Sequence, residues 1–542
     1  MSEPKTLTIT EFGGPLTRRS DGDINSGLAK YDSSWGYDPY SKPGNLTWME
    51  QPTSVLTSGT QVIVAMTNYY TGGNNEIRLV AGQASLIGIK TSTGSTAPNA
   101  DTVSILGTVT GIGDLDQTQV GIVKFGATTE KLFVGGDDAI VKVNVDGSSR
   151  SVVTDGVSGF NTNRPRPMSE FIGKIYFGNG NNIGEIDSTE TVTTATKLSP
   201  SFPQNTYVVD LDTTPDGNYM VITVNDTLLG GGSEFIGANT SNNKEARSGT
   251  SRKLYWNGID DSFTAQEKLG GFSAYSNVSF ADKDYTLGYG QSGAVVYSGT
   301  SQKLSLPKVQ APYATATLPI SNMLTFGSIE FDPEDDKMKT SIFQYGQYDE
   351  ETPNGLYRLL KQGAQVRDDI KSVPTALSVS NLVYYPSIFA ATDHIGGVSK
   401  MYYATIESNN QGPANLLGKL WRFSLSPTGL GSVLSGTYET QTQLFSKKVQ
   451  VKEVRLYTEP LVGGNDFVID LIGSGGSVIS GGSQRFQITE AGSVATGTDM
   501  VHFNPQVAPT YALGVRITNS SVTGVANWTA TKLEIDYSDG GK

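Results

Sequence analysis

Several residue types that carry protein chemistry are absent or rare in this 542-residue chain. It has no cysteine, which excludes disulfides, thiol catalysis and cysteine-ligated zinc. It has only two histidines, His394 and His502, so a histidine-rich metal site is not available. Neither lies in a sequence typical of a nucleophile and its base, and we interpret both as structural or surface residues. The sequence therefore offers little for thiol-based or histidine-based chemistry.

Long apolar runs and basic stripes are absent as well. No stretch approaches 18 apolar residues, and the first residues, MSEPKTLTIT, lack the apolar segment of a secretory signal. We therefore expect neither a membrane span nor a signal peptide. Charged residues make up 17% of the chain and the net charge is −13, which does not favour a binder of the nucleic-acid backbone. The acidic balance keeps a large protein soluble, and it would also let DNA pass through a channel without adhering.

Glycine and strand-forming residues, in contrast, are abundant. The chain has 63 glycines, and Tyr, Thr, Ser and Val dominate its ordered-looking stretches. This composition predicts short strands joined by tight turns. The most helix-like run, residues 354–371, is interrupted by Gly363. We therefore predict an all-β protein.

One short phrase occurs more than once in the middle of the chain. KLFVGGDDAIVKVNVDG (131–147) and KIYFGNGNNIGEID (174–187) share a lysine, an apolar-aromatic triplet, a glycine, a polar turn and a second strand closed by an acidic residue. They begin about 43 residues apart, and KLYWNG follows at Lys253, with NYMVITVND (218–226) as a candidate intervening copy. A period near 40 residues with several strands per unit predicts β-propeller blades. Two unrelated β-sandwiches with similar hairpins are the alternative.

Changes in sequence texture predict three regions. Residues 1–53 are irregular and rich in glycine, proline and aromatics, which predicts an extended N-terminal arm packed across a surface. Residues 54–435 hold six or seven irregular blades, with KLYWNG in the fifth. Residues 436–542 contain five or more alternating strands, the pattern of a C-terminal antiparallel β-sandwich.

Two clusters of carboxylates are candidates for binding a cation. DPEDDK (332–337) holds four acids and DLDTTPDGN (210–218) holds three, and either could supply oxygen ligands to Ca²⁺. Neither matches the twelve-residue calcium loop, because Pro215 stands where the turn glycine is required. We interpret both as solvated turns between strands.

Aromatic pairs and propeller-type catalytic motifs are the remaining candidates. Paired tyrosines could line a carbohydrate-binding surface, although aromatics on adjacent strands more often pack together; they are Tyr384, Tyr385, Tyr402 and Tyr403. The S-x-D-x-G-x-x-W box of sialidases, the phosphate-binding P-loop and the Rossmann fingerprint are all missing from the sequence. Separated acids could still pair in space as in a glycosidase. We predict no enzyme, and no catalytic, cofactor-binding or metal-binding residues.

Two stretches resemble a known group of proteins. Residues 12–53, with a Gly-Gly phrase and the turn Pro43-Gly44-Asn45-Leu46, resemble the N-terminal segment of bacteriophage tail hub and nozzle proteins. Residues 436–461, with a Gly-x-x-x-Thr strand and a strand ending in Glu-Pro-Leu, are similar to a segment near the C-terminus of such proteins. The resemblance implies a β-propeller that assembles as a ring, commonly of six copies, around the axial channel of a short tail. No catalytic residues carry over.

The resemblance implies a structural function. We expect a non-enzymatic virion protein that is assembled in the host cytoplasm and contacts copies of itself, portal or adaptor proteins and tail fibres, with DNA as non-specific cargo. In this interpretation the N-terminal arm reaches a neighbouring subunit or adaptor. A receptor-binding or glycan-binding tail fibre or spike is the main alternative, and a propeller glycosidase is a third.

Overall fold

The structure is a computed structural model of the chain. It describes residues 4–12, 31–35, 37–38, 44–48, 53–57, 63–71, 74–81, 85–90, 102–109, 111–112, 121–126, 130–136, 138–162, 164, 166–199, 201–204, 206–214, 216–225, 251–269, 272–280, 283–290, 293–298, 301–305, 323–332, 337–346, 355–361, 382–388, 392–395, 398–409, 416–424, 436–461, 464–488, 494–519 and 528–539. Within these residues no helix is long and apolar enough to cross a membrane.

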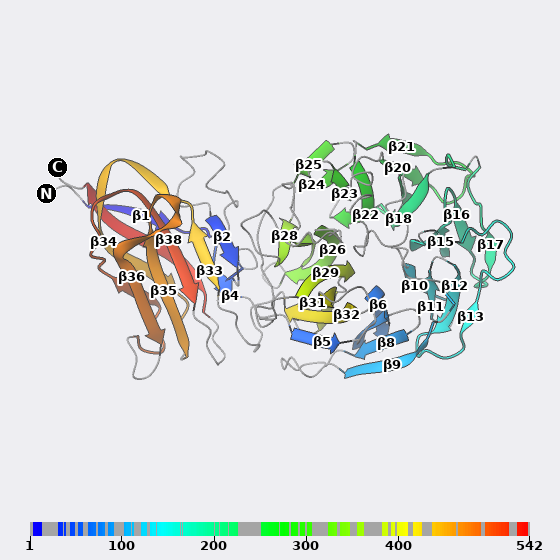
Figure 1. The fold of residues 1–542 in the computed structure, drawn as a ribbon, viewed down its shortest axis with the longest axis horizontal. Coiled ribbons are helices and arrows are strands. Elements are labelled where there is room, and N and C mark those ends of the chain that lie inside the picture. The colour runs from blue at the N-terminus through cyan, green and yellow to red at the C-terminus, as the bar shows by residue number, and fades with distance from the viewer. Residues whose placement is uncertain are drawn as a thin grey trace.

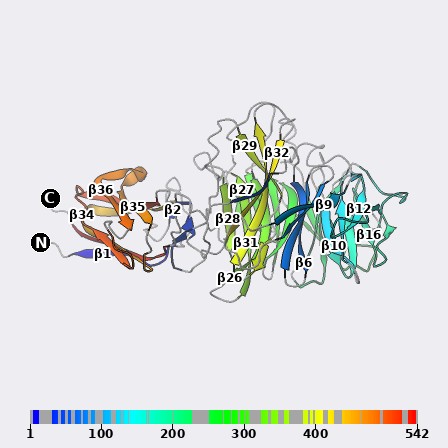
Figure 2. The ribbon, with the colours of Figure 1, turned by 90° about the horizontal axis from the view of Figure 1, so that it is seen from below.

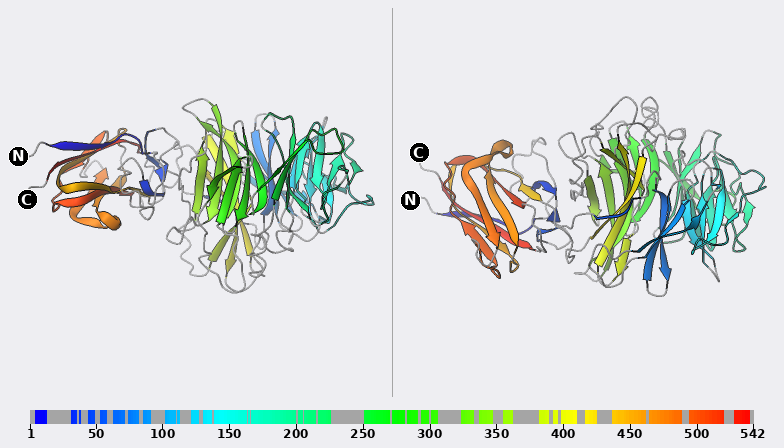
Figure 3. Two further views of the ribbon diagram at one scale, coloured as in Figure 1. Left: turned by 90° about the horizontal axis from the view of Figure 1, so that it is seen from above. Right: turned by 60° about the horizontal axis from the view of Figure 1, so that its bottom comes forward.

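Seven antiparallel sheets stand around a common axis and form a β-propeller (Figure 1). Their innermost strands contact each other in chain order, and the last of them contacts the first. Seen from the side, the blades make a thick disc with a second domain beside one edge (Figure 2, Figure 3). The predicted all-β fold with a propeller is confirmed, and the blade count is seven.

Five blades have four described strands each, which run from the axis outward in chain order. Blade 1 contains β6 (Ile63–Thr71), β7 (Asn74–Ala81), β8 (Ser85–Lys90) and β9 (Thr102–Thr108). Blade 2 contains β10 (Gly121–Phe125), β11 (Lys131–Gly135), β12 (Ile140–Asn144) and β13 (Ser151–Val152). Blade 3 contains β14 (Met168–Phe171), β15 (Lys174–Gly178), β16 (Ile183–Ile186) and β17 (Val192–Thr194). Blade 4 contains β18 (Tyr207–Thr213), β19 (Met220–Asn225), β20 (Ser251–Trp256) and β21 (Ala265–Lys268). Blade 5 contains β22 (Phe272–Phe280), β23 (Lys283–Gly290), β24 (Gly293–Ser298) and β25 (Ser301–Ser305).

The last two blades differ from this pattern. Blade 6 has three described strands, β26 (Met323–Asp332), β27 (Lys337–Gly346) and β28 (Gly355–Lys361). Blade 7 contains β29 (Leu382–Ile388), β30 (Thr392–Ile395), β31 (Val398–Asn409) and β32 (Leu416–Ser424), and its outermost strand is β5 (Thr53–Thr57). In the β5–β32 pair, Thr57 is opposite Lys419 and Thr53 is opposite Arg422. A strand from before blade 1 therefore closes the ring.

The repeated phrase occupies equivalent places in successive blades. KLFVG is β11 and KIYFG is β15, each the second strand of its blade, and NYMVITVND supplies β19, the second strand of blade 4. The prediction that KLYWNG belongs to a fifth blade is wrong. It forms β20, which pairs along its whole length with β19 inside blade 4. Residues 226–250 separate these two strands in the sequence, and an insertion of this length imitates the spacing of a repeat.

The acidic residue at the end of each phrase has a clear structural role. In the turn after β12, the Asp146 carboxylate accepts the backbone N–H of Ser148 at 2.9 Å. After β16, Asp187 accepts the N–H of Thr189 at 2.8 Å. Asn257 repeats this contact after β20, where its side-chain oxygen accepts the N–H of residue 259 at 3.0 Å. Each residue thus caps the turn between the third and fourth strands.

The C-terminal domain is an antiparallel sandwich of two layers, as predicted. One layer contains β1 (Lys5–Ile9), β39 (Ala530–Asp539), β34 (Gln443–Thr458) and β37 (Met500–Phe503). The other contains β2 (Tyr31–Trp35), β33 (Thr437–Thr440), β38 (Thr510–Asn519), β35 (Asn465–Ile472) and β36 (Val478–Ile488). The layers join where β34 pairs with β38, and the short 3₁₀ helix η3 (Ser474–Gly476) precedes β36. A small ladder of β3 (Tyr37–Asp38) and β4 (Thr47–Trp48) lies next to β2.

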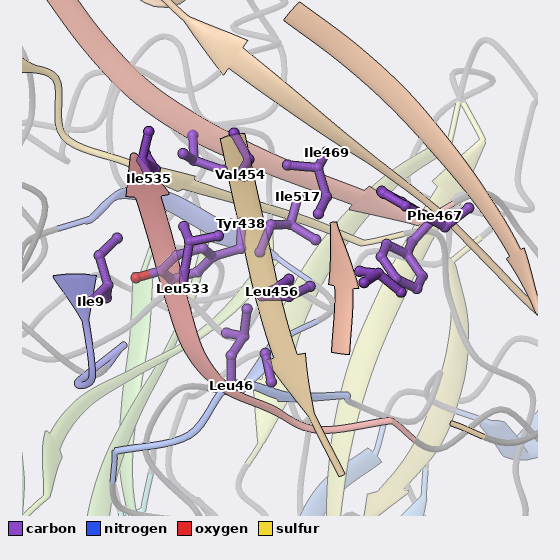
Figure 4. Packing of buried hydrophobic residues seen from close by; sticks show 14 of the residues in the cluster. Ile9, Leu46, Tyr438, Val454, Leu456, Phe467, Ile469, Ile517, Leu533 and Ile535 are labelled. Carbon is purple, nitrogen blue, oxygen red and sulfur yellow. The ribbon is translucent and has the colours of Figure 1, made fainter. Parts of the chain in front are cut away.

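Strands β1 and β2 of the predicted N-terminal arm belong to this sandwich, and β3 and β4 form the small ladder beside it, so these strands are not a separate arm. Strand β1 pairs with β39 along all its residues, and β2 pairs with β33. Leu46 forms a bridge with Ala530. The side chains of Ile9 and Leu46 are buried in the core between the layers (Figure 4), and Phe12 belongs to the same cluster. Because burial of apolar surface is the main favourable term in folding, these side chains contribute to the stability of the sandwich.

We expect this N-terminal segment to be required for the stability of the sandwich. The Phe12 side chain is fully buried, with its ring 5.6 Å from that of Tyr438, whose hydroxyl donates to the Phe12 carbonyl at 3.0 Å. Phe12→Ala should lower the free energy of unfolding by about 3–5 kcal/mol, measured by chemical denaturation. Thr8→Ala, at an exposed position of the same segment, is the control and should change it by less than about 0.5 kcal/mol. Equal effects of the two changes would mean that this segment is not part of the core.

Candidate functional site

A polar network surrounds the turn that joins β15 to β16, with sequence Asn-Gly-Asn-Asn (179–182). The side chain of Asn179 is fully buried. Its oxygen accepts the N–H of Asn161 at 2.8 Å, and its nitrogen donates to the carbonyls of Gly159 at 2.9 Å and Ala195 at 2.8 Å. Asn182 both donates to the Leu198 carbonyl and accepts the Leu198 N–H, each at 2.9 Å. One turn therefore fixes the two loops that lead into the innermost strands β14 and β18.

Arg166 completes this network from the loop before β14. Its side chain is fully buried, and its guanidinium donates to the carbonyls of Gly136 at 3.1 Å, Gly178 at 2.9 Å and Asn161 at 2.6 Å. A further bond reaches the Asn179 side-chain oxygen at 3.1 Å, and the guanidinium carbon lies 4.2 Å from the centre of the Phe160 ring. The carbonyl dipoles and the aromatic face compensate the buried positive charge.

The glycine that ends the apolar triplet in each phrase follows from this packing. A Cβ on Gly135 would lie 2.6 Å from the side chain of Arg166, and a Cβ on Gly178 would lie 2.8 Å from Pro167. For Gly135 this contact is with the loop that leads into the next blade, whereas Pro167 belongs to the blade of Gly178 itself, and Cβ of Val208 in blade 4 would lie 3.3 Å away. A larger residue at either position would force these close contacts apart, so the repeated glycine meets a requirement for close approach beside the second strand.

An ion cluster connects blades 2 and 3. The Glu190 carboxylate, in the turn between β16 and β17, lies 2.5 Å from the Lys131 ammonium and 3.0 Å from that of Lys142. These lysines belong to β11 and β12, so one carboxylate spans the blade interface. Glu190 has φ +63°, a left-handed conformation that costs about 1–2 kcal/mol for a residue with a side chain. The ion cluster accounts for a charged residue at this strained position.

A second carboxylate cluster lies within blade 3. Burial of Glu185 opposes its ionisation, but hydrogen bonds from Lys174 at 2.7 Å and Thr193 at 3.0 Å hold its pKa below the ordinary value. Lys197 adds a positive charge 3.4 Å away. Burial, together with the nearby Glu185 charge, raises the pKa of Tyr176 well above its ordinary value. Glu185 and Tyr176 are therefore ionised and neutral, respectively, at neutral pH.

The outer face of the sandwich carries a third network. The Arg455 guanidinium lies 2.8 Å from Glu453, 3.1 Å from Glu534 and 2.8 Å from Asp536. A hydrogen bond from Lys532, assisted by one from the Tyr457 hydroxyl, lowers the pKa of Glu534. The arginine bridges β34 and β39, so this network stabilises the sheet on its polar side.

The candidate residues from the sequence do not form a common site. His394 is in β30 of blade 7, whereas His502 is in β37 of the sandwich with Nδ1 3.1 Å from Glu453. Tyr384 lies opposite Glu407 and Tyr402 lies opposite Arg422, so the paired tyrosines do not face each other in the sheet. Their side chains, and that of His394, are outside the described part of the structure.

The interpretation of the acidic clusters as solvated turns is confirmed for Asp216, but it is wrong for Asp210 and Asp212, which are half-buried residues of strand β18. Asp332 and Lys337 are opposite each other at the ends of β26 and β27, and residues 333–336 lie outside the described residues. Asp216 accepts hydrogen bonds from Thr214 at 2.5 Å and from the Asn218 backbone at 3.1 Å, all within its own turn. No group of three or more His, Asp or Glu side chains in the described part of the chain could hold a metal ion.

Sequence reasoning missed the network around Arg166. Its members come from a polar turn and a loop that carry no catalytic motif, and only the repeated phrase pointed to this region. The hydrogen bonds of Arg166, Asn179 and Asn182 go mainly to backbone groups, and they make two loops rigid at one end of blades 2 to 4. Such an arrangement suits a preformed contact surface, since rigid loops lose little entropy on binding.

Comparisons with known proteins do not identify the chain. No family model matches it, and no curated protein matches its sequence. Similar solved structures include Trypanosoma rangeli sialidase, at 8% identity over 100% of this chain and 97% of that chain with a TM-score of 0.33. The Dos1 propeller matches at 10% identity over 76% of this chain and 95% of that chain, with a TM-score of 0.35. A glycoside hydrolase family 43 arabinoxylan arabinofuranohydrolase from Bacillus subtilis matches at 9% identity over 89% and 96%, with a TM-score of 0.27.

These neighbours include glycosidase and sialidase structures, but the similarity is too low to establish an enzymatic activity in this chain. At such identities and TM-scores the likeness carries no argument about substrate, site or partner. The propeller assignment rests on the seven sheets and their closed order.

We expect removal of the Asn179 side chain to loosen both loops. Asn179→Ala leaves the backbone groups that bond to this side chain, in both loops, without their hydrogen bonds. The free energy of unfolding should fall by about 2–4 kcal/mol. Hydrogen exchange of peptides covering residues 159–161 and 195–198 should become faster. Asn218→Ala, in an exposed turn of blade 4, is the control and should leave both peptides unchanged. Unaltered exchange in the Asn179 variant would contradict the proposed holding role.

The Glu190 cluster predicts a pH dependence of stability. Burial opposes ionisation of Glu190, but hydrogen bonds from Lys131 and Lys142 lower its pKa below the ordinary 4.5. A depressed carboxylate pKa stabilises the fold above the ordinary pKa, and this stabilisation is lost as pH falls through the folded-state value. Glu190→Gln should therefore cost about 1–3 kcal/mol at pH 7, with a difference from the natural protein that shrinks below about pH 4.

Glu130→Gln is the matched control for this measurement. Glu130 lies 2.8 Å from Lys124, but its side chain is 40% exposed, so water screens the pair. Its substitution should change stability by less than about 0.5 kcal/mol at pH 7. A Glu190→Gln effect that stays constant between pH 7 and pH 3 would show that ionisation of this group is unimportant for the blade interface.

Proposed function

We propose that this chain is a non-enzymatic structural protein of a tailed-bacteriophage virion. In this proposal copies of the chain assemble into a ring of the tail nozzle or hub, around the channel through which DNA passes. Its partners are copies of itself, portal or adaptor proteins and tail fibres, and its location is the virion tail after assembly in the host cytoplasm.

One observation carries the proposal: the two stretches that resemble tail hub and nozzle proteins come together in space. Residues 12–53 and 436–461 lie at opposite ends of the sequence, yet β2 pairs with β33 and Phe12 packs against Tyr438. A resemblance confined to two distant segments is easier to explain if those segments form one structural unit. The contact between the two segments therefore supports the resemblance, and it locates the resemblance in the sandwich and in its connection to the propeller.

The character of the described polar networks also supports a structural function. Arg166, Asn179 and Asn182 hold loops, and Glu190 holds neighbouring blades together. In a virion component, rigidity of the propeller would keep the ring and its channel in a fixed geometry.

The purified full-length chain should form closed rings, with about six copies in each, when imaged by negative-stain electron microscopy. Mass photometry of the same sample should show one dominant oligomer of matching mass. Trimers with a stalk would favour the receptor-binding or glycan-binding alternative, and a protein that stays monomeric at micromolar concentration would contradict the proposal. Turnover of any member of a glycan panel by the purified chain would favour a propeller glycosidase instead.

A further inference from the structure

A strained, exposed isoleucine lies on the turn between β14 and β15. Phe171 pairs with Lys174, so Ile172 and Gly173 form a two-residue hairpin loop, with φ +49° and φ +67°. Such loops favour Asn-Gly, because a β-branched side chain is unfavourable at positive φ. Ile172 is nevertheless 60% exposed, so packing within the monomer buries less than half of its surface.

A second exposed isoleucine is its neighbour from blade 4. Gly258, in the turn after β20, is so close that a Cβ there would lie 2.8 Å from Cδ1 of Ile172. The next residue, Ile259, is 75% exposed. Exposed acids flank the two isoleucines in sequence: Glu170 before the first, and Asp260 and Asp261 after the second. We call this set the acidic-apolar patch.

The sandwich carries a surface of the opposite charge. Strand β34 bulges between Leu444 and Val449, opposite the segment of β38 that contains Tyr511. Leu444 is 40% exposed and Tyr511 is 54% exposed. Lys447 and Lys448 are exposed in the bulge, and the Lys448 ammonium lies 5.6 Å from the centre of the Tyr511 ring. We call this set the basic-apolar patch.

We propose that the acidic-apolar patch of one copy of this chain binds the basic-apolar patch of a second copy. Both surfaces combine exposed apolar side chains with charges of one sign, and the signs are opposite. Complementary charge fixes partner and register at an interface, while the apolar side chains supply contact area. A positive-φ isoleucine on the surface is then explained by its contact with the neighbour.

The position of the two patches makes this contact head-to-tail. Blade 3 lies on the side of the ring opposite the sandwich, with blade 4 beside it (Figure 1). A contact between different patches of identical chains repeats from copy to copy, and it closes into a ring if the rotation allows. This inference rests on the proposed function, because the contact between the two patches is the one by which the proposed ring would form.

Charge reversal of each patch provides the test. Glu170→Lys with Asp261→Lys, or Lys447→Glu with Lys448→Glu, should each weaken self-association of the full-length chain at least about tenfold in mass photometry. The variant with all four changes should recover association to within about threefold of the natural protein, because the signs are complementary again. Asp155→Lys and Lys452→Glu, at exposed positions outside the patches, are the controls and should associate normally.

Ile172→Asn separates the contact from a structural role. Asparagine suits the left-handed turn, so this variant should melt at a higher temperature while associating more weakly. If Ile172 only stabilised its own blade, its replacement would lower both the melting temperature and the strength of self-association.

The possible outcomes separate this contact from the ring itself. If rings form and neither charge reversal weakens them, or the fourfold variant is as weak as the double variants, the contact is wrong and the ring proposal stands. If association depends on both patches but yields dimers or open chains, the contact stands and the ring proposal fails. A natural protein that remains monomeric overturns both.

Discussion

The pairing of β5 with β32 is the constraint on which the rest of the structure depends. It closes the propeller without a covalent bond, using one strand from before blade 1 and one from blade 7. Thr53 is opposite Arg422, near the end of β32, so the chain enters and leaves the propeller at adjacent strands. The propeller is thereby an insertion between β4 of the small ladder and β33 of the sandwich. The entropic cost of joining distant segments grows only slowly with their separation, so one such closure can organise a chain of this length.

Within the ring, successive blade interfaces use different chemistry. Arg78 of blade 1 donates to the Val145 carbonyl of blade 2 at 2.8 Å. Glu190 of blade 3 binds two lysines of blade 2, whereas the contact of blades 3 and 4 is aromatic, with Tyr176 and Trp256 edge-to-face at 4.9 Å. A propeller can vary in this way because the shared requirement is only that neighbouring sheets pack closely. The lysine at the start of β11 and β15 is a repeated residue whose partner differs, Glu190 in one case and Glu185 in the other.

The fold was predictable where its determinants are local. The alternation of β11, β12, β15 and β16, their glycines and their turn-capping acids lie within short windows, and the repeat spacing exposed the propeller. The blade of KLYWNG was not predictable, because an insertion before β20 mimics a repeat. Nor was the place of β1, since Lys5 pairs with Tyr537 across nearly the whole chain and no local pattern records such a pairing. The network around Arg166 was missed for the same reason, as its partners become neighbours only after the blades have formed.

Two non-glycine residues of blade 3 have a strained backbone conformation, and they differ in what compensates the strain. Glu190 and Ile172 both have positive φ, at +63° and +49°, and each would be more stable as glycine or asparagine if the turn alone mattered. For Glu190 the compensation is visible, because its carboxylate binds two lysines of the neighbouring blade. For Ile172 the exposed side chain offers no comparable gain inside the monomer. Strained backbone conformations concentrate at functional sites, which points to a benefit outside the monomer. A partner that buries Ile172 together with Ile259 provides that benefit. The interacting surface then lies on the β14–β15 turn and the turn after β20. The rigid loop network lies around a different turn of blade 3, the one between β15 and β16.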